Sequence, residues 1–221
     1  MLQVNRRSAL LAMGALPFGL HADRKPSPVA AIVTEYRNNS HADVIVGKIL
    51  EGWKQDGGLG PNLKLAAIYV DQFPKADMSN VLSKKHGFPI TKTIEEAITL
   101  GTSKVQVAGV LSIAEHGKYP YTPKTKQHMY PRRRFFDEIT DTFGKCGQVV
   151  PVFNDKHLAY NWKDAKHMYD RAQTMKIPFM AGSSLPVAWR LPAKVLPIGT
   201  QIEEAIGIGY SGLESYGFHA L

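Results

Sequence analysis

Hydrophobic positions follow two different spacings along the chain from residue 29 onward. Short, continuous apolar runs are typical of strands buried on both faces, and they lie at residues 29–33, 63–70, 105–113, 149–153 and 178–181. Between them, apolar residues recur every three or four positions, which predicts helices over residues 40–56, 78–86, 94–100, 131–143 and 161–176. Strands that alternate with helices indicate βαβ units. The predicted fold is therefore α/β, with a Rossmann-like doubly wound, mostly parallel sheet.

The first residues of the chain depart from this pattern. Arg6 and Arg7 precede a modest apolar stretch, residues 9–20, that is too short to cross a bilayer as a helix. Residues 1–22 therefore predict a signal peptide of the twin-arginine type, and an N-terminal extension of a cytoplasmic protein is the alternative. On the first interpretation we expect a periplasmic or secreted protein without stable membrane insertion. Residues 23–28, which include two prolines, are then a linker.

The charge of the chain limits its classes of partner. The formal net charge is +8, or about +6 without Arg6 and Arg7. A nucleic-acid-binding protein is expected to carry a long basic stripe with interleaved aromatic residues. Here the dense basic cluster is short, and it consists of Lys124, Lys126, His128, Arg132, Arg133 and Arg134. It predicts a solvated basic surface or an anion-binding loop, and no nucleic-acid partner is expected.

Cysteine and histidine usage makes a metal centre unexpected. Cys146 is the single cysteine, which excludes an internal disulfide and a cysteine-based zinc or iron–sulfur site. The eight histidines lack tight pairs at the spacing of metal ligands, so no dedicated metal site is predicted.

Ligands of open α/β sheets bind beyond the carboxyl ends of the strands. The predicted strand ends are followed by polar segments at residues 34–39, 71–74, 112–116, 154–157 and 182–184. These segments are the first place to search for a binding site, although a fold of this kind does not by itself define a function.

Four stretches of the sequence, taken in order, carry a resemblance to a known family. They are YVDQFPKADMSNVLSKKHGFPITKTIEEAI at residues 69–98, VAGVLSIAEHGKYP at 107–120, VPVFNDKHLAYNWKDAKHMYDRAQTMKIPFMAGSS at 150–184, and GYSGLESYGFHAL at 209–221. In this order and spacing they resemble the Gfo/Idh/MocA family of NAD(P)-dependent oxidoreductases. The resemblance implies a dinucleotide-binding-type domain over residues 29–190.

The resemblance also implies a second, substrate-covering α/β domain. Residues 191–221 are expected to be its start, with its first strands at residues 195–209. Too few residues follow for that domain to bury a core of its own, so we expect an incomplete domain, and a C-terminal appendage is the alternative.

Cofactor contacts follow from the resemblance at several positions. Asp71 matches the acid that binds an adenosine ribose hydroxyl, which favours NAD over NADP because a carboxylate repels a 2′-phosphate. Its alternative role is to open the turn Asp-Gln-Phe-Pro. Ser112, Glu115 and His116 match the strand end and loop that contact the cofactor in the family.

Two residues match the family's proton-transfer groups. Lys156 matches the lysine of the E-K-P motif, where an ammonium can stabilise the alkoxide that precedes hydride loss. His219 matches the general acid/base, a role that suits histidine near neutral pH. The motifs are altered around them, however. Asp155 and His157 replace the Glu and Pro that flank the lysine, and Ser215 stands where the family has an Asp.

The turn after the first strand departs most from the family. A dinucleotide-binding turn carries G-x-G-x-x-G, so that backbone N–H groups reach the pyrophosphate at the helix N-terminus. The sequence TEYRNNSHAD, residues 34–43, has no glycine. Thr34, Arg37 and Asn38 remain candidates for cofactor contact, Arg37 through a phosphate. Tyr36 and Arg37 are expected to keep a ligand away from the backbone, so an ordinary pyrophosphate grip is not expected.

Three hypotheses for function follow. The first is an exported NAD(P)-dependent oxidoreductase that acts on a sugar or polyol, with Lys156 and His219 transferring protons. The second is a non-catalytic descendant of the fold that binds a carbohydrate or another ligand and has lost the cofactor loop. A purely structural or interaction domain is the third. The first two hypotheses imply a small-molecule partner. The sequence is compatible with a homo-oligomer but does not predict one.

Overall fold

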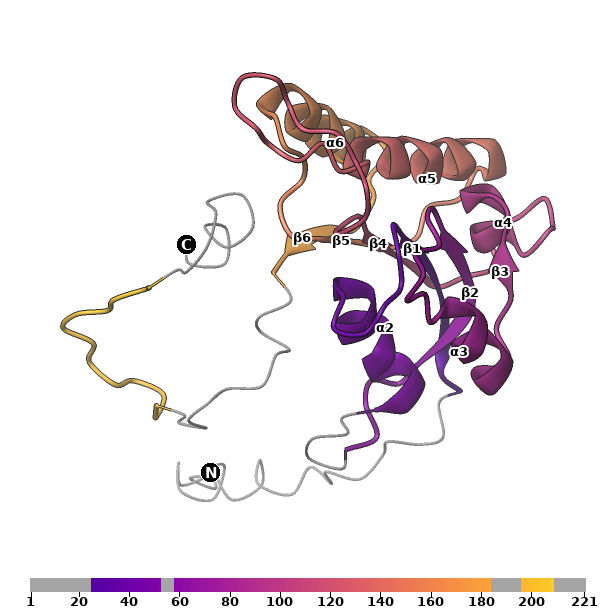
Figure 1. Ribbon diagram of the computed structural model, residues 1–221, viewed down its shortest axis with the longest axis horizontal. Coiled ribbons are helices and arrows are strands. Elements are labelled where there is room, and N and C mark those ends of the chain that lie inside the picture. Colours follow the sequence, from indigo (N-terminus) through magenta and orange to yellow (C-terminus); the bar gives the residue numbers. More distant parts are fainter. Residues whose placement is uncertain (1–24, 53–57, 184–195, 209–221) are drawn as a thin grey trace, which may run out of the picture.

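The computed structural model describes residues 25–52, 58–183 and 196–208 of the chain. Within them, six parallel strands form one sheet in the order β3-β2-β1-β4-β5-β6 (Figure 1). The strands are β1 Ser27–Val33, β2 Leu63–Val70, β3 Ile90–Thr91, β4 Gly109–Ile113, β5 Val152–Asp155 and β6 Phe179–Gly182. The helices are α2 His41–Glu51, α3 Ser79–His86, α4 Ile94–Thr99, α5 Arg132–Cys146 and α6 Trp162–Thr174. The predicted Rossmann-like, doubly wound α/β fold is confirmed.

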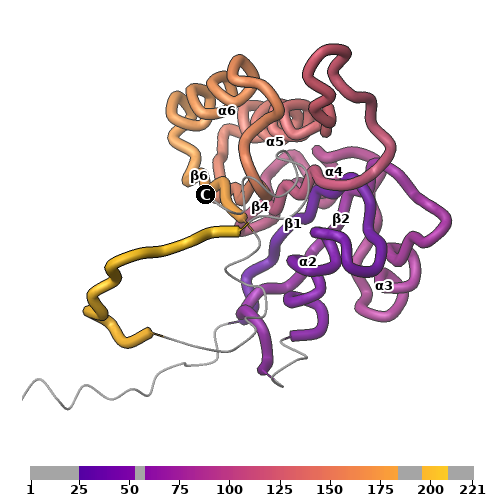
Figure 2. The backbone as a smooth tube through the Cα atoms, turned by 60° about the vertical axis from the view of Figure 1, so that its left-hand side comes forward, coloured from indigo at the N-terminus to yellow at the C-terminus, as the bar shows by residue number. Residues whose placement is uncertain are grey.

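Helices cover both faces of this sheet. In two views, α4, α5 and α6 lie on one side of the strands and α2 and α3 on the other (Figures 1 and 2). Each strand contributes alternate residues to the two sides, since successive side chains point to opposite faces. Ala30 and Ile32 of β1 belong to the core under α4, α5 and α6, whereas Ala31 and Val33 belong to the core under α2. This two-sided burial explains why the strands are continuous apolar runs.

The strand order reverses beside β1. The chain runs from β1 outward through β2 to β3, then returns to place β4 on the opposite side of β1. In open sheets of this kind, ligands bind at such a switch point, outside the carboxyl ends of the two strands. The residues that follow β1 and β4 are therefore the first to search for a site.

The helix ends follow local sequence signals. Ser40, Thr93 and Asn161 are N-caps whose side chains accept a hydrogen bond from a backbone N–H in the first turn. The predicted helix over residues 40–56 is too long, because α2 ends at Glu51. Gly52 has φ 69° there, and a Cβ on it would lie 2.6 Å from the Gly58 carbonyl oxygen. Only glycine fits that position.

Other boundaries also differ from those predicted. Strand β1 begins at Ser27, so the last two residues of the predicted linker belong to the sheet. Strand β4 begins at Gly109, although residues 105 and 107 ahead of it are buried valines. The strands predicted over residues 195–209 are wrong for the described part, residues 196–208, which forms no strand and leaves its isoleucines exposed.

Some predictions lie outside the described residues. They concern the signal peptide over residues 1–22 and His219. The division into domains at residue 190 stays a prediction as well. Among the residues that the structure describes, no helix combines the length and the apolar character needed to cross a bilayer.

Candidate functional site

A buried ionic cluster lies at the carboxyl ends of β4 and β5. Glu115, two residues after β4, accepts from Lys156 Nζ at 2.6 Å through one carboxylate oxygen and from Arg132 Nη2 through the other. Arg132 is the first residue of α5, and Lys156 directly follows β5. The exposed fractions of Glu115, Arg132 and Lys156 are only 6%, 1% and 2%. We call these three residues the Glu115 triad.

Hydrogen bonds fix the backbone beside the triad, and two residues there have a strained conformation. Thr34 Oγ1 donates to the Glu115 carbonyl oxygen at 2.6 Å, which joins the ends of β1 and β4. Lys156 N donates to the Gly182 carbonyl oxygen at 2.7 Å. Lys156 and the neighbouring His116 both have left-handed backbone, with φ 66° and 72°. Side chains in this region cost free energy and concentrate at functional sites.

The charges of the triad determine the ionisation of Glu115. Burial by itself would raise the pKa of this carboxyl group, but the adjacent Arg132 and Lys156 charges outweigh it and hold the pKa below its usual range. Glu115 is therefore a carboxylate at neutral pH, and both of its oxygens are engaged. That Glu115 contacts a cofactor stays a prediction, because its bonds to Arg132 and Lys156 do not show what else the carboxylate could bind.

A second group of polar residues faces α2. His41 Nδ1, in the first residue of α2, lies 2.6 Å from Asp155 Oδ2. Arg37 donates to Glu35 at 2.6 Å and to His116 Nδ1 at 3.2 Å. Burial and the charge of His41 lower the pKa of His116 to about 4, so its imidazole is neutral at physiological pH. The switch point thus combines fixed charges with a neutral ring.

The loop between β1 and α2 bonds to itself. Ser40 Oγ accepts from the backbone N–H groups of Arg37 and Asp43, each at 3.3 Å. Asp43 Oδ2 accepts from Asn39 N at 2.9 Å. These N–H groups, and the positive end of the helix, are those that a pyrophosphate would use. The chain's own hydroxyl and carboxylate occupy them. The expectation that an ordinary pyrophosphate grip is absent stays a prediction.

The expectation that Tyr36 keeps a ligand away from the backbone is wrong. Tyr36 does not shield the backbone from a ligand, because its side chain is fully buried in the core under α2. Asn39 adopts the left-handed conformation, with φ 59°, and Asn38 is exposed beside it. The bend is thus made by an asparagine, and a tyrosine fills the space beneath the helix.

Asp71, after β2, is engaged by three side chains. Tyr69 Oη and Arg134 Nη2 donate to its Oδ1 at 2.7 and 2.5 Å, and Tyr119 Oη donates to its Oδ2 at 2.6 Å. Burial would raise the pKa of Asp71, but these hydrogen bonds together with the Arg134 charge hold it below its usual range. A ribose that binds this carboxylate must share it with these partners, because Oδ1 already accepts two hydrogen bonds and Oδ2 accepts one. Because Arg134 also neutralises it, a preference for NAD over NADP no longer follows from Asp71.

This arrangement predicts the effect of Asp71→Asn. The amide has one acceptor oxygen in place of two and carries no charge. The free energy of unfolding should therefore fall by about 1–2 kcal/mol. The expected loss is no larger because Arg134 is partly exposed, and solvent screens its charge. The loss should vanish at low pH. The wild-type contribution is present above the unfolded pKa and disappears as the pH falls through the lower, folded pKa. Urea unfolding at pH 7 and pH 3 measures both. An equal loss at the two pH values would contradict this account.

Ser112 lies apart from the ligand-facing loops. It is fully buried on β4, in register with Asn154 of β5. Side chains two residues apart on a strand share a face, so Ser112 lies with Val110 on the α5 side of the sheet. Its hydroxyl has no hydrogen-bond partner among the described residues. Of the predicted site residues, the structure thus brings Thr34, Arg37, Glu115, His116 and Lys156 together, with Asp71 linked to them through α5.

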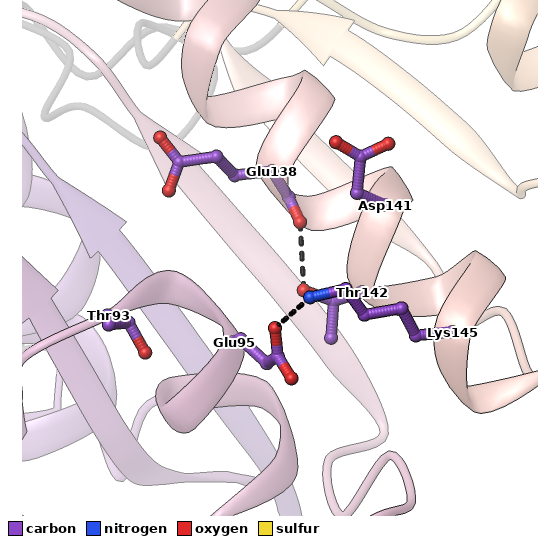
Figure 3. A pocket seen from close by; sticks show the side chains of 6 residues that line it. All are labelled: Thr93, Glu95, Glu138, Asp141, Thr142 and Lys145. Carbon is purple, nitrogen blue, oxygen red and sulfur yellow. Dashed lines mark hydrogen bonds and ion pairs between the residues drawn. The ribbon is translucent and has the colours of Figure 1, made fainter.

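A shallow groove of about 510 Å³ lies elsewhere, between α4 and α5 (Figure 3). Its lining consists of Thr93, Glu95, Glu138, Asp141, Thr142 and Lys145. Lys145 Nζ donates to Glu95 across it at 2.5 Å. None of these residues belongs to the strand ends, and the ion pair is exposed, so we do not place the functional site there. The described residues hold no group of three His, Cys, Asp or Glu side chains arranged for a metal ion.

Comparison with known proteins gives similarity in structure only. No protein-family model and no curated protein sequence matches the chain. Solved structures that are similar include a Gfo/Idh/MocA family oxidoreductase from Vibrio cholerae, with 17% identity, a TM-score of 0.43 and coverage of 71% of this chain and 38% of that protein. An apo scyllo-inositol dehydrogenase from Lactobacillus casei is 11% identical, with a TM-score of 0.46 and coverage of 72% of this chain and 37% of that protein. A biliverdin reductase from Synechocystis sp. PCC 6803, in complex with biliverdin and NADP+, is 12% identical, with a TM-score of 0.43 and coverage of 71% of this chain and 37% of that protein.

These likenesses include the family that the sequence resembles. The chain spans less than two fifths of the length of each of the three proteins. The strand order itself establishes the fold. The roles of individual residues rest on their own contacts.

Three site residues were not among the predicted cofactor-binding or catalytic residues: His41, Arg132 and Asp155. Arg132 was placed in a basic cluster predicted to be a solvated surface or an anion-binding loop. The solvated surface is wrong for Arg132, which is almost fully buried, and the anion-binding alternative stays a prediction. A signal was present: Arg132 precedes Phe135, Phe136 and Ile139 at helical spacing, which places it on the apolar face of α5. The pairing of His41 with Asp155 had no such signal, since it joins residues 114 positions apart.

Proposed function

We propose that this domain binds a small polyhydroxylated molecule, of the sugar or polyol class, beside the Glu115 triad. The observation that supports it is the burial of three charged side chains at the switch point. Buried ion pairs contribute little net stability and are often replaceable by apolar residues of similar size. Charges held at the ligand-binding edge of this fold are therefore better explained by function than by folding.

The chemistry of the site suits hydroxyl groups. The Lys156 ammonium has three N–H donors, and Glu115 engages one of them. The neutral ring of His116, whose pKa is about 4, accepts from Arg37 through Nδ1, so its Nε2 carries the proton and can donate to a ligand. Donors placed around a carboxylate over a short distance match the hydroxyls of a sugar ring or polyol.

Binding in this proposal does not use a dinucleotide held in the usual manner. The loop amides of Arg37, Asn39 and Asp43 are bonded within the loop, and Asp71 is bonded to its three neighbours. Both halves of the ordinary grip, on pyrophosphate and on ribose, are thus engaged by the chain itself. This supports the second of the three hypotheses, a ligand-binding descendant of the fold.

One observation favours a second candidate function, an NAD(P)-dependent oxidoreductase acting on the same substrate class. Lys156 is a buried ammonium at the end of β5, where it could hydrogen-bond a substrate hydroxyl and stabilise the alkoxide formed on deprotonation. A nicotinamide cofactor would supply the hydride acceptor. Arg37, which is partly exposed, would then be available to meet a phosphate.

Thermal-shift titration of the full chain distinguishes the two. We expect sugars or polyols to raise the melting temperature by about 5–10 °C near 100-fold excess over the dissociation constant, and millimolar NAD or NADP to leave it unchanged. A shift with either cofactor would replace the first function by the second, and no shift with any compound would reject both. Lys156→Met should abolish the sugar shift. Lys145→Met, at an exposed ion pair in the α4–α5 groove, is the matched control and should preserve it.

A further inference from the structure

The Glu115 triad is not electrically neutral. One carboxylate faces two cations, which leaves a net charge of about +1 on three side chains that are each at least nine-tenths buried. Both oxygens of Glu115 are already used. Burying an uncompensated charge is costly, and proteins normally pair it with an opposite charge.

Apart from Glu115, no carboxylate among the described residues pairs with Arg132 or Lys156. Glu35 is paired with Arg37, and Asp155 is hydrogen-bonded to His41 on the α2 side. Two histidines, His116 and His157, lie next to the triad, and the pKa of each is lowered to about 4. Burial is the main cause for both, followed by the charge of His41 for His116 and of Arg132 for His157. They are neutral at physiological pH and add no charge to the triad.

Arg132 also has unused donors. Its Nη2 donates to Glu115, but its Nε and Nη1 have no hydrogen-bond partner among the described residues. A guanidinium is always charged and has no acceptor, so these groups can be satisfied only by an acceptor. Leaving such donors buried and unbonded costs free energy. The charge and the donors together describe a place for an anion.

We propose that the ligand is a sugar acid or polyhydroxy acid whose carboxylate is held by Arg132 and Lys156. This rests on the proposed function and narrows its substrate class. A carboxylate brings one negative charge, which neutralises the triad. A phosphate monoester brings about 1.5 to 2 negative charges and would overcompensate it. The hydroxyls of the same molecule then meet the remaining donors and acceptors at the switch point.

The test compares acids with their neutral counterparts on the wild-type chain at constant ionic strength. Glucuronate, galacturonate and gluconate are paired with glucose, galactose and sorbitol, and glucose 6-phosphate and succinate are added as further probes. Isothermal titration should show at least one acid binding tenfold or more tightly than its neutral partner and than the phosphate. Equal affinity within every pair, or tighter binding of the phosphate, would overturn the inference while the proposed function stands. Binding of succinate alone would reject the sugar-class function but keep the carboxylate site, and no binding at all would reject both.

Two arginine variants separate recognition from folding. Arg132→Met leaves Glu115 and Lys156 as a neutral pair, so the preference for acid over neutral partner should fall to about one. That ratio is internal to each protein, and general destabilisation would not change it. Arg133→Met is the control, because Arg133 pairs with Asp137 and Asp164 outside the triad, and it should keep the wild-type ratio. An unchanged preference in Arg132→Met would also overturn the inference.

Discussion

Glu115→Gln is expected to lower the free energy of unfolding by about 3–5 kcal/mol. The glutamine has nearly the same shape, but it leaves Arg132 and Lys156 buried side by side with no negative charge between them. Removing one partner of a buried ion pair is far more damaging than the net value of the pair, because the desolvation cost of the remaining charge is no longer offset. Here two cations lose their partner at once. Urea unfolding at pH 7 measures the loss.

Two comparisons test whether charge is the cause. Glu138→Gln removes an exposed carboxylate on α5 that pairs with Arg134, and it should cost less than about 1 kcal/mol. The double variant Glu115→Gln with Lys156→Met removes one of the unpaired cations and should recover part of the stability. If the double variant were as unstable as the sum of the single ones, packing rather than charge would explain the effect.

The pH dependence gives a further check on the same variant. The folded pKa of Glu115 lies below its unfolded value of about 4.3. Its contribution is therefore present above pH 4.3 and is lost as the pH falls through the folded pKa. His116 and His157 have folded pKa values depressed to about 4, so they remove stability from about pH 6.5 downward. The difference between wild type and Glu115→Gln should hence narrow only below about pH 4.3.

The fold could be predicted because its strands are buried on both faces. A run such as β2, which is apolar except at Lys64, leaves little choice of structure, and its predicted bounds, residues 63–70, are those observed. Strand β3 was missed because two residues are too short to show any period. The strand at residues 105–113 was overextended because Val105 and Val107 are buried without belonging to the sheet. Hydrophobicity reports burial, whereas strand pairing depends on neighbours distant in sequence.

The site could be predicted only in part, for a related reason. Lys156 and Glu115 were found because each lies in a polar segment after a predicted strand and matches a position of the family that the sequence resembles. The parallel sheet brings such positions to one edge. Their mutual ion pair, and the role of Arg132, depend on where the 18-residue connection from β4 returns the chain to begin α5. The engagement of Asp71 by Tyr119 depends on that same connection. Short-range patterns carry no information about such closures.

The buried tyrosine of the first loop leads to the second large prediction. Tyr36→Ala should lower the free energy of unfolding by about 3–5 kcal/mol, since it removes a fully buried aromatic side chain from the core under α2 and leaves a cavity. Tyr36→Phe should cost less than about 1 kcal/mol or even stabilise the fold. The Tyr36 hydroxyl has no hydrogen-bond partner among the described residues, so its removal relieves a buried, unbonded polar group.

Chemical denaturation of the two variants, side by side, measures this contrast. It tests whether the side chain in the bend, and not a ligand, holds the loop against the helix. In a dinucleotide-binding turn a glycine at such a position lets the backbone approach the ligand, and the ligand completes the structure. If Tyr36 has taken over that role, Tyr36→Phe should keep the ligand-induced thermal shift, and Tyr36→Ala should weaken folding without creating a shift for NAD. Equal destabilisation by both substitutions would show that the hydroxyl is bonded. A new NAD shift in Tyr36→Ala would show that the tyrosine had excluded a cofactor that the loop can still hold.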